Sequence, residues 1–290
     1  MRRGREYVLS GGRALGYDMY GPAGGRPVLY FHGTPSSRLD FHMFGSDALV
    51  ERLGIRFVAV DRPGCGLSAF QPHRTIGDWP AGIAELADGL GLDAFAVLGW
   101  SGGGPYALAC VGALGRRISA AAVVSSMGPF DVPGLADGIN SQSRTFFRLN
   151  RERPVIGRPL DRLTVLGARR NPGQFLDKTT SSLPLPDRRA LGASGVGRAY
   201  IDAVGECFRS GPKGGQLDTS LMVGPWDFDP HAIDVPVLLR HGGQDANAPL
   251  AMGRWLAVEI PGCRARFLTG EGHISLITSH ADEILRSLVG

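Results

Sequence analysis

The chain has 290 residues, of which 43% are hydrophobic and 20% are charged. These proportions exclude a wholly disordered chain, and the length suffices for one large α/β domain with or without an insertion. The formal net charge of +4 arises from 31 basic and 27 acidic residues. Because the basic residues form no long block, we expect a solvated surface and no nucleic-acid partner.

The spacing of the cysteines and the hydropathy of the chain indicate the cellular compartment in which the protein resides. Four widely spaced cysteines form no C-x-x-C pair, which is typical of reduced thiols in a cytoplasmic protein. The basic N-terminal segment MRRGREYVLS is not followed by an apolar segment, so we expect no signal peptide. The chain also has no apolar run of membrane-spanning length, so we expect no membrane association.

From the N-terminus, short apolar runs alternate with segments of helical spacing. A pattern typical of a hairpin comes first, split by a Gly-Gly turn, and the later runs are apolar throughout, as in strands buried on both faces. The runs predict strands at residues 7–9, 14–20, 27–31, 57–60 and 120–125, with another that begins at Phe95. The segments between them predict helices at residues 39–53 and 76–90, and a third that includes Leu108.

This alternation stops near Gly128 and resumes with a strand at residues 236–240. A helix at 250–259, a strand at 266–268 and a final helix ending at Leu288 complete the pattern. The intervening segment is Arg-rich, punctuated by Pro and Gly, and has helical pieces at 140–149 and 194–208 but no convincing strand. We therefore expect a core domain of residues 1–130 and 232–290, with a helical cap inserted at 131–231.

The fold class that follows is α/β, a mostly parallel sheet flanked by helices and carrying an inserted helical cap. Ligands of such sheets bind outside the carboxyl ends of the strands. Chemically active side chains lie at several predicted strand ends, namely His32, Asp61, Ser101, Asp245 and His273. The sequence therefore predicts a site at that edge of the sheet.

The stretch FAVLGWSGGGPYAL, residues 95–108, contains the most specific motif. Its Gly99-Trp100-Ser101-Gly102-Gly103 segment follows a predicted strand and opens a predicted helix, which is the context of a G-x-S-x-G nucleophile elbow. Small residues at Gly99 and Gly103 are a steric requirement of such a turn. We therefore predict that Ser101 is a nucleophile exposed above the sheet.

A serine hydroxyl needs a neighbouring base, and the base needs an orienting carboxylate. His273, in a glycine-rich loop after the strand at 266–268, is the predicted base, and Asp245, directly after the strand at 236–240, is the predicted acid. Two alternatives stay open. Asp131 follows the preceding strand and could serve as the acid, and His280 is a second histidine, placed where the last helix is expected to start.

Backbone N–H groups can stabilise the oxyanion that forms when a serine attacks a carbonyl. The N–H of Gly102, at the start of a helix, and that of Thr34, after a central strand, are the predicted donors. His32 and His241 precede glycine-rich turns, where a histidine commonly bonds the loop backbone. No His, Asp or Glu residues have convincing metal-ligand spacing, so we expect neither a metal nor a cofactor.

The segments HGTP, DRPGCGLS, GWSGGGPYAL, HGGQDANAP and EGHISL occur in this order along the chain. Together they resemble the α/β-hydrolase superfamily, in particular its cap-bearing, esterase-like branch, over residues 5–130 and 232–290. The resemblance implies Ser101 as nucleophile, His273 as base, Asp245 as acid, and an oxyanion hole of the Thr34 and Gly102 N–H groups. Branches that open epoxides or remove halides carry aspartate at the elbow, and Ser101 argues against both.

The function predicted from these residues is that of a carboxylesterase-like serine hydrolase that cleaves a small, mainly apolar substrate. The same triad also serves carbon–carbon bond hydrolysis, lactone opening or peracid formation, and a hydrolase-like ligand receptor is a further alternative. Aromatic residues beside the elbow and in or near the cap are candidates for the substrate pocket, namely Trp100, Phe130 and Trp226. The motifs do not specify the substrate or the oligomeric state.

Overall fold

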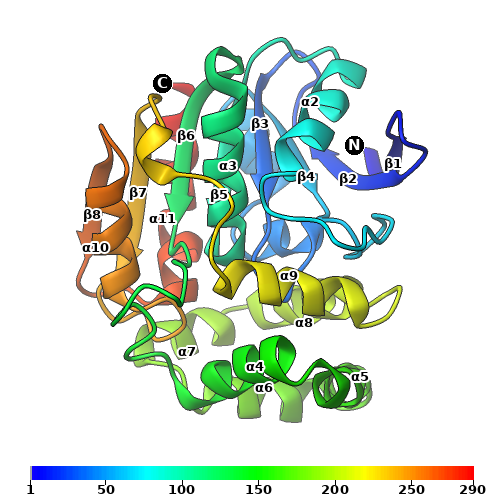
Figure 1. The fold of residues 1–290 in the computed structure, drawn as a ribbon, viewed down its shortest axis with the longest axis vertical. Helices are drawn as coiled ribbons and strands as arrows, with labels where there is room; N and C mark the ends of the chain where they lie inside the picture. Colours follow the sequence, from blue (N-terminus) through cyan, green and yellow to red (C-terminus); the bar gives the residue numbers. More distant parts are fainter. Residues whose placement is uncertain (1) are drawn as a thin grey trace.

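A computed structural model describes residues 2–290 as an eight-stranded sheet with helices on both faces (Figure 1). The strands are β1 (Arg2–Val8), β2 (Ala14–Tyr20), β3 (Arg26–Phe31), β4 (Ile55–Val60), β5 (Phe95–Trp100), β6 (Ile118–Val124), β7 (Val237–Gly242) and β8 (Arg264–Leu268). Their order across the sheet is β1-β2-β4-β3-β5-β6-β7-β8. β2 is antiparallel to β1 and β4, and all other neighbours are parallel, which confirms the predicted α/β class.

The two faces of the sheet bury separate apolar layers. Alternate side chains of a strand point to opposite faces, so Leu29 and Phe31 of β3 join one layer while Val28 and Tyr30 join the other. The first layer is covered by α2 (Trp79–Gly89), α3 (Gly104–Leu114) and α10 (Leu250–Glu259), and the second by α1 (Asp47–Arg52) and α11 (His273–Val289). Burial on both faces explains why the central strands are apolar throughout.

Residues 141–223 form a helical layer at the end of the sheet toward which the parallel strands point (Figure 1). Its helices are α4 (Ser141–Glu152), α5 (Pro154–Arg170), α6 (Pro172–Thr180), α7 (Leu185–Gly192), α8 (Val196–Cys207) and α9 (Lys213–Val223). The described residues between 131 and 231 contain no strand. The division into a core domain and a cap with the boundaries given above remains a prediction.

The predicted helix at residues 39–53 is divided in two. A 3₁₀ helix η1 (Arg38–Met43) ends before Gly45, and α1 follows. A Cβ atom at Gly45 would collide with the ring of Phe41, so the chain turns where that ring packs. Ser46 then starts a new helix, because its hydroxyl accepts a hydrogen bond from the Leu49 N–H at 3.2 Å.

The last helix begins earlier than its predicted start near His280. It starts at His273, and His280 lies inside it with a non-helical φ of −116°. This position puts His273 at a helix N-terminus, where the backbone N–H groups have no partner within the helix. Over residues 2–290, no helix has the length and apolar character needed to cross a membrane.

Candidate active site

Ser101 lies on a left-handed turn directly after β5. It is the first residue of the 3₁₀ helix η2 (Ser101–Gly103), which leads into α3. Its φ is 55°, a conformation that costs a non-glycine residue on the order of 1–3 kcal/mol. A Cβ atom at Gly99 would lie 2.6 Å from the Gly103 carbonyl oxygen, and one at Gly103 would collide with the Phe31 carbonyl. Both glycines therefore permit the turn that the motif predicts.

Three predicted site residues come together at the ends of their elements. His273 Nε2 is 2.8 Å from the hydroxyl oxygen of Ser101, and His273 Nδ1 is 2.8 Å from Oδ2 of Asp245. The other carboxylate oxygen of Asp245 accepts hydrogen bonds from the backbone N–H groups of Asn247 and Ala248 at 2.9 and 2.7 Å. These bonds fix the carboxylate, which in turn fixes the plane of the imidazole.

Charge shifts the pKa values of this pair in opposite directions. Burial raises the pKa of Asp245, but the positive charge of His273 and its hydrogen bond outweigh burial and hold that pKa below its ordinary value. Burial lowers the pKa of His273, but the charge of Asp245 outweighs it, so this pKa lies above the ordinary 6.5. The arrangement thus favours a protonated imidazole beside an ionised carboxylate, the pair that forms when His273 removes a proton from Ser101.

The two alternative residues lie elsewhere. Asp131 is exposed and makes no contact with His273 in the described structure. His280 Nε2 lies 3.0 Å from Oε1 of Glu271, in the loop before α11. The geometry therefore favours Asp245 and His273 as the partners of Ser101.

The two predicted oxyanion donors belong to neighbouring loops. Thr34 follows β3, and a Cβ atom added at Gly102 would collide with the Thr34 side chain, so the two backbones approach closely beside Ser101. Thr34 and Ser101 line the same cavity. Their N–H groups remain the predicted donors for a developing oxyanion.

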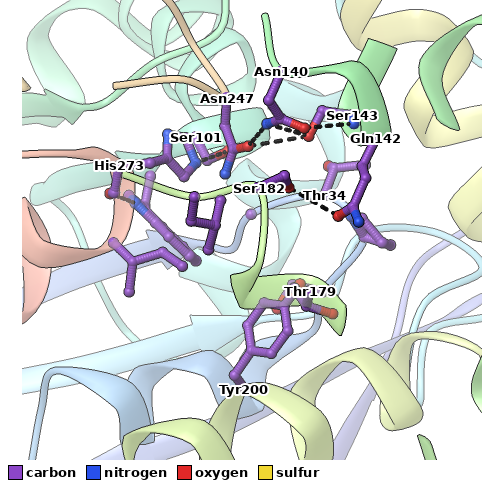
Figure 2. A pocket seen from close by; sticks show the side chains of 16 residues that line it. Thr34, Ser101, Asn140, Gln142, Ser143, Thr179, Ser182, Tyr200, Asn247 and His273 are labelled. Atoms are coloured by element: carbon purple, nitrogen blue, oxygen red, sulfur yellow. Dashed lines mark hydrogen bonds between the residues drawn. The ribbon is translucent and has the colours of Figure 1, made fainter. Parts of the chain in front are cut away.

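The cavity above Ser101 has two lobes, both lined by Thr34, Ser101, Asn247 and His273. The polar lobe is formed by Asn140, Gln142, Ser143, Ser182 and Asn247 (Figure 2). The aromatic lobe is formed by Met127, Phe146, Phe147, Phe175, Val204 and Phe208. Apart from His273, the described lining residues carry no charged side chain. Such walls suit an uncharged ligand.

The three predicted pocket aromatics have different positions. Trp100 lines the polar lobe, and its indole N–H donates a hydrogen bond to the His273 carbonyl oxygen at 3.3 Å. Phe130 and Trp226 are not among the residues that line the two lobes, and their place in a substrate pocket stays a prediction. Phe130 packs edge-on against Phe147 at 5.5 Å, and Trp226 stacks on Phe228 at 5.2 Å.

The sequence also matches a known protein family. A model described as "Alpha/beta hydrolase family" matches residues 28–287, almost the whole chain. The chain belongs to the alpha/beta hydrolase family. The match spans both parts of the sheet and the helical segment between them.

Individual relatives of this alpha/beta hydrolase include enzymes of two kinds. A non-heme chloroperoxidase of Streptomyces lividans is 29% identical over 256 residues, which cover 84% of this chain and 83% of the relative. An esterase from Rhodococcus sp. ECU1013 has a TM-score of 0.71 at 20% identity, with 99% and 98% of the two chains covered. A bromoperoxidase from Bacillus anthracis has a TM-score of 0.71 at 21% identity, with 99% of each chain covered. At these identities the two structures show a shared fold.

Sequence reasoning missed Asp187, which comes from α7 and is fully buried beneath the N-terminus of α11. Its carboxylate accepts hydrogen bonds from the backbone N–H groups of His273, Ile274 and Ser275 at 2.8–2.9 Å. A carboxylate at this end of a helix satisfies unpaired donors and complements the helix dipole. Asp187 therefore fixes the N-terminus of α11, the helix that carries the imidazole of His273. The sequence offers no local signal for it, because the residue lies far along the chain.

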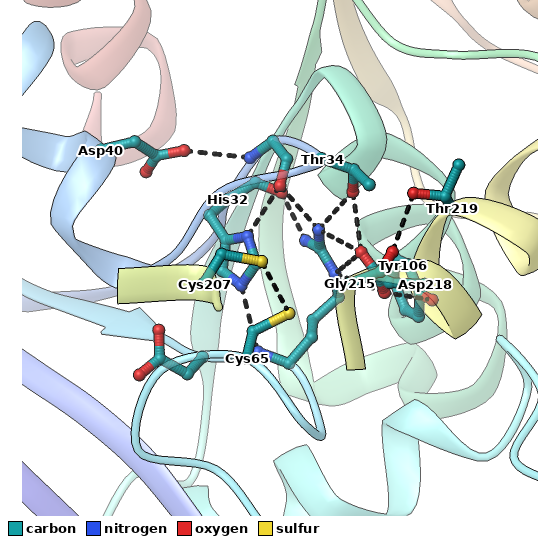
Figure 3. Close-up of polar contacts among 12 residues, drawn as sticks. His32, Thr34, Asp40, Cys65, Tyr106, Cys207, Gly215, Asp218 and Thr219 are labelled. Carbon is teal, nitrogen blue, oxygen red and sulfur yellow. Dashed lines mark hydrogen bonds and ion pairs between the residues drawn. The ribbon is translucent and has the colours of Figure 1, made fainter. Parts of the chain in front are cut away.

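A second cluster of buried charged and polar side chains forms hydrogen bonds with the Thr34 loop (Figure 3). Asp218, on α9, accepts hydrogen bonds from the Thr34 hydroxyl at 2.7 Å and from Arg62, Arg74 and Tyr106 at 2.8–3.0 Å. Burial would raise the pKa of Asp218, but the two guanidinium groups outweigh burial and hold it far below its ordinary value. Arg62 also donates to the Gly33 carbonyl oxygen at 2.8 Å. The ionised carboxylate thus links the helical layer to the loop with the predicted oxyanion donor.

Over the described residues, no group of three or more His, Cys, Asp or Glu side chains is arranged to hold a metal ion. His32 and His241 instead bond loop backbone: His32 Nδ1 lies 2.7 Å from the Gly33 carbonyl oxygen, and His241 Nε2 lies 2.8 Å from that of Ala248.

The Asp187 contact predicts a change in the protonation of His273. The substitution Asp187→Asn keeps a carbonyl acceptor for the helix terminus but removes a negative charge that raises the pKa of His273. We expect that pKa to fall, as measured by NMR titration of the imidazole. The substitution Asp177→Asn, at an exposed position of α6, is the control. An unchanged His273 titration in Asp187→Asn would contradict the assignment.

The Asp218 cluster predicts a large loss of stability on removal of its carboxylate charge. The substitution Asp218→Asn leaves two buried guanidinium groups without their counter-ion, and breaking such a pair costs about 3–5 kcal/mol. The free energy of unfolding in a denaturant titration measures this loss. The matched control is Asp202→Asn, because Asp202 pairs with Arg198 at the surface, where ion pairs contribute little. Equal effects of the two substitutions would refute the buried-pair interpretation.

Proposed function

We propose that the chain is a serine hydrolase that cleaves an ester or related acyl bond of a small, uncharged, mainly apolar substrate. The observation that carries the proposal is the 2.8 Å contact of Ser101 with His273, on a turn whose φ of 55° presents the hydroxyl to a cavity. The nucleophile, its base and the orienting acid then stand in one continuous hydrogen-bonded chain. The family of the chain agrees with hydrolytic chemistry on this fold.

In the proposed reaction, His273 Nε2 accepts the proton of Ser101 while the hydroxyl oxygen attacks the substrate carbonyl carbon. The N–H groups of Thr34 and Gly102 stabilise the oxyanion, and Asp245 stabilises the imidazolium. The intermediate collapses to an acyl-enzyme as His273 gives the proton to the departing alcohol. Water, deprotonated by His273, then attacks the acyl group, and the carboxylic acid leaves as Ser101 recovers its proton.

The shape of the cavity supports the substrate class. The aromatic lobe presents Phe146, Phe147, Phe175 and Phe208 beside Ser101, and these side chains provide an apolar surface for an alkyl or aryl group. A charged substrate would lose its hydration without gaining a partner, because the described lining offers no opposite charge.

The proposal predicts covalent labelling by a fluorophosphonate probe. Peptide mapping should locate the label on Ser101, and the substitution Ser101→Ala should abolish it. A screen of aryl esters of increasing acyl length, lactones and vinylogous diketones then identifies the bond cleaved. Labelling that persists in Ser101→Ala would overturn the assignment of the nucleophile.

The acid of the triad is tested by a pair of substitutions. We expect Asp245→Asn to lower kcat on the order of 10⁴-fold, because the imidazole loses the carboxylate that fixes its tautomer and stabilises its charge. The matched control is Asp131→Asn, at the alternative acid, which should leave kcat unchanged. A large loss in Asp131→Asn with little loss in Asp245→Asn would reverse the two roles.

A second candidate activity is peracid formation, and the similarity to a chloroperoxidase over 84% of the chain favours it. Hydrogen peroxide would take the place of water: its oxygen attacks the acyl-enzyme, a peroxycarboxylic acid leaves, and Ser101 recovers its proton. The peracid can then oxidise bromide in solution and return to the carboxylic acid. With ethyl acetate as the acyl donor, ethanol leaves as the acyl-enzyme forms, and bromination of a dye in the presence of hydrogen peroxide and bromide should therefore depend on Ser101. Bromination that survives Ser101→Ala would exclude this route.

A further inference from the structure

Asn247 stands two residues after Asp245 and lines both lobes of the cavity. Its side-chain oxygen accepts hydrogen bonds from Nδ2 of Asn140 at 2.6 Å and from the Ser143 hydroxyl at 3.0 Å (Figure 2). Within the described residues, no hydrogen bond uses Nδ2 of Asn247. The amide nitrogen, with two N–H donors, is thus left on the cavity side.

The orientation of the Asn247 side-chain amide is set by Asn140, whose hydrogen-bond donor and acceptor are themselves fixed by other contacts. Asn140 caps α4, and its side-chain oxygen accepts a hydrogen bond from the Ser143 backbone N–H at 2.9 Å. Its Nδ2 must therefore be the donor to Asn247, and it also donates to the Ala246 carbonyl oxygen at 3.1 Å. Reversing the Asn247 amide would place two nitrogens against each other. The helix cap consequently determines which end of Asn247 faces the substrate.

Tyr200 supplies a second donor from the opposite wall. It projects from α8, and Figure 2 shows its ring reaching toward Thr179 and the space above it. Its hydroxyl makes no hydrogen bond among the described residues, although the ring lines both lobes. Burial raises the pKa of Tyr200 to about 12, so the hydroxyl keeps its proton at neutral pH.

We infer that Asn247 and Tyr200 form a subsite for a neutral acceptor oxygen of the substrate, such as an ether, a hydroxyl or a second carbonyl. This oxygen is distinct from the carbonyl that Ser101 attacks, and the inference rests on the proposed acyl hydrolysis. An apolar group at the same place would leave two donors without water or partner, which disfavours its binding. The neutral lining makes an uncharged oxygen the fitting ligand, since an anion would lack a counter-charge.

The subsite is tested with pairs of esters of equal length, in which one methylene is replaced by an ether oxygen. One series places the oxygen in the acyl part and the other in the alcohol part, so the result also shows which part reaches the subsite. For one series at least, we expect kcat/KM to favour the ether by about 10-fold or more. Equal values for both members in both series would overturn the inference.

Two substitutions assign the preference to these residues. Asn247→Leu and Tyr200→Phe should each reduce the preference, because kcat/KM should fall more for the ether than for the methylene ester. Tyr200→Phe leaves no protein group unpaired, so it separates a loss of substrate contact from a loss of folding. The matched control is Gln244→Leu, an amide-to-leucine change at an exposed position of the same loop, which should keep the preference. A preference undiminished in both Asn247→Leu and Tyr200→Phe would refute the subsite.

Binding to the Ser101→Ala variant separates this inference from the proposed function. Calorimetry with the same ester pairs should show tighter binding of the ether, and adding Asn247→Leu should remove the difference. If binding discriminates but the wild-type chain hydrolyses no ester, the subsite stands and the proposed reaction fails. If the wild-type chain hydrolyses both members equally and binding does not discriminate, the reaction stands and the subsite fails.

Discussion

The left-handed turn at Ser101 is the constraint on which the site depends. With φ at 55°, the residue leaves β5 sharply enough to raise its hydroxyl above the strand ends. The turn exists only because Gly99 and Gly103 let β5, α3 and the end of β3 approach within backbone contact. That same approach places the Thr34 loop against Gly102, so a single packing requirement positions Ser101 and both predicted oxyanion donors.

The helical layer contributes directly to the geometry of this site. Three of its carboxylates reach into the sheet domain, one from each of α7, α8 and α9. Asp187 binds the N-terminus of α11, Glu206 pairs with Arg38 at 2.9 Å, and Asp218 binds Arg62 and Arg74. Two of these contacts end on the segments that carry His273 and Thr34. The layer therefore supports the segments that carry Thr34 and His273, and it also contributes to the wall of the cavity.

Much of the fold, and the meeting of Ser101, Asp245 and His273, could be predicted from the sequence for a physical reason. Parallel strands bring their carboxyl ends to one edge, so the residues after β5 and β7 and the loop after β8 are neighbours whatever lies between them. Ser101 and Asp245 each follow an apolar strand, and His273 follows a short strand and a glycine-rich loop, so local pattern was enough to select them. The predicted helix at 39–53 failed because the ring of Phe41, a tertiary contact, decides where the chain turns.

Residues of the helical layer could not be assigned in this way. Helices without a sheet between them have no common edge, so spacing along the chain does not indicate which side chains meet. Phe130 and Trp226 were predicted to line the pocket from their aromatic character, yet that character serves packing equally well. Asp187 and Tyr200 were missed for the same reason, since their roles depend on which core groups α7 and α8 approach.

The distribution of charge differs between the wall of the cavity and the groups behind it. Ionised groups stand one layer behind the wall: Asp218 and Arg62 behind Thr34, and Asp187 behind His273. The side chains that line the cavity are neutral apart from the imidazole. Because neutral walls screen charge poorly, the attraction between Asp245 and a protonated His273 is stronger there than in water. Charge thus holds the loops in place, while uncharged donors and aromatic rings form the surface of the cavity.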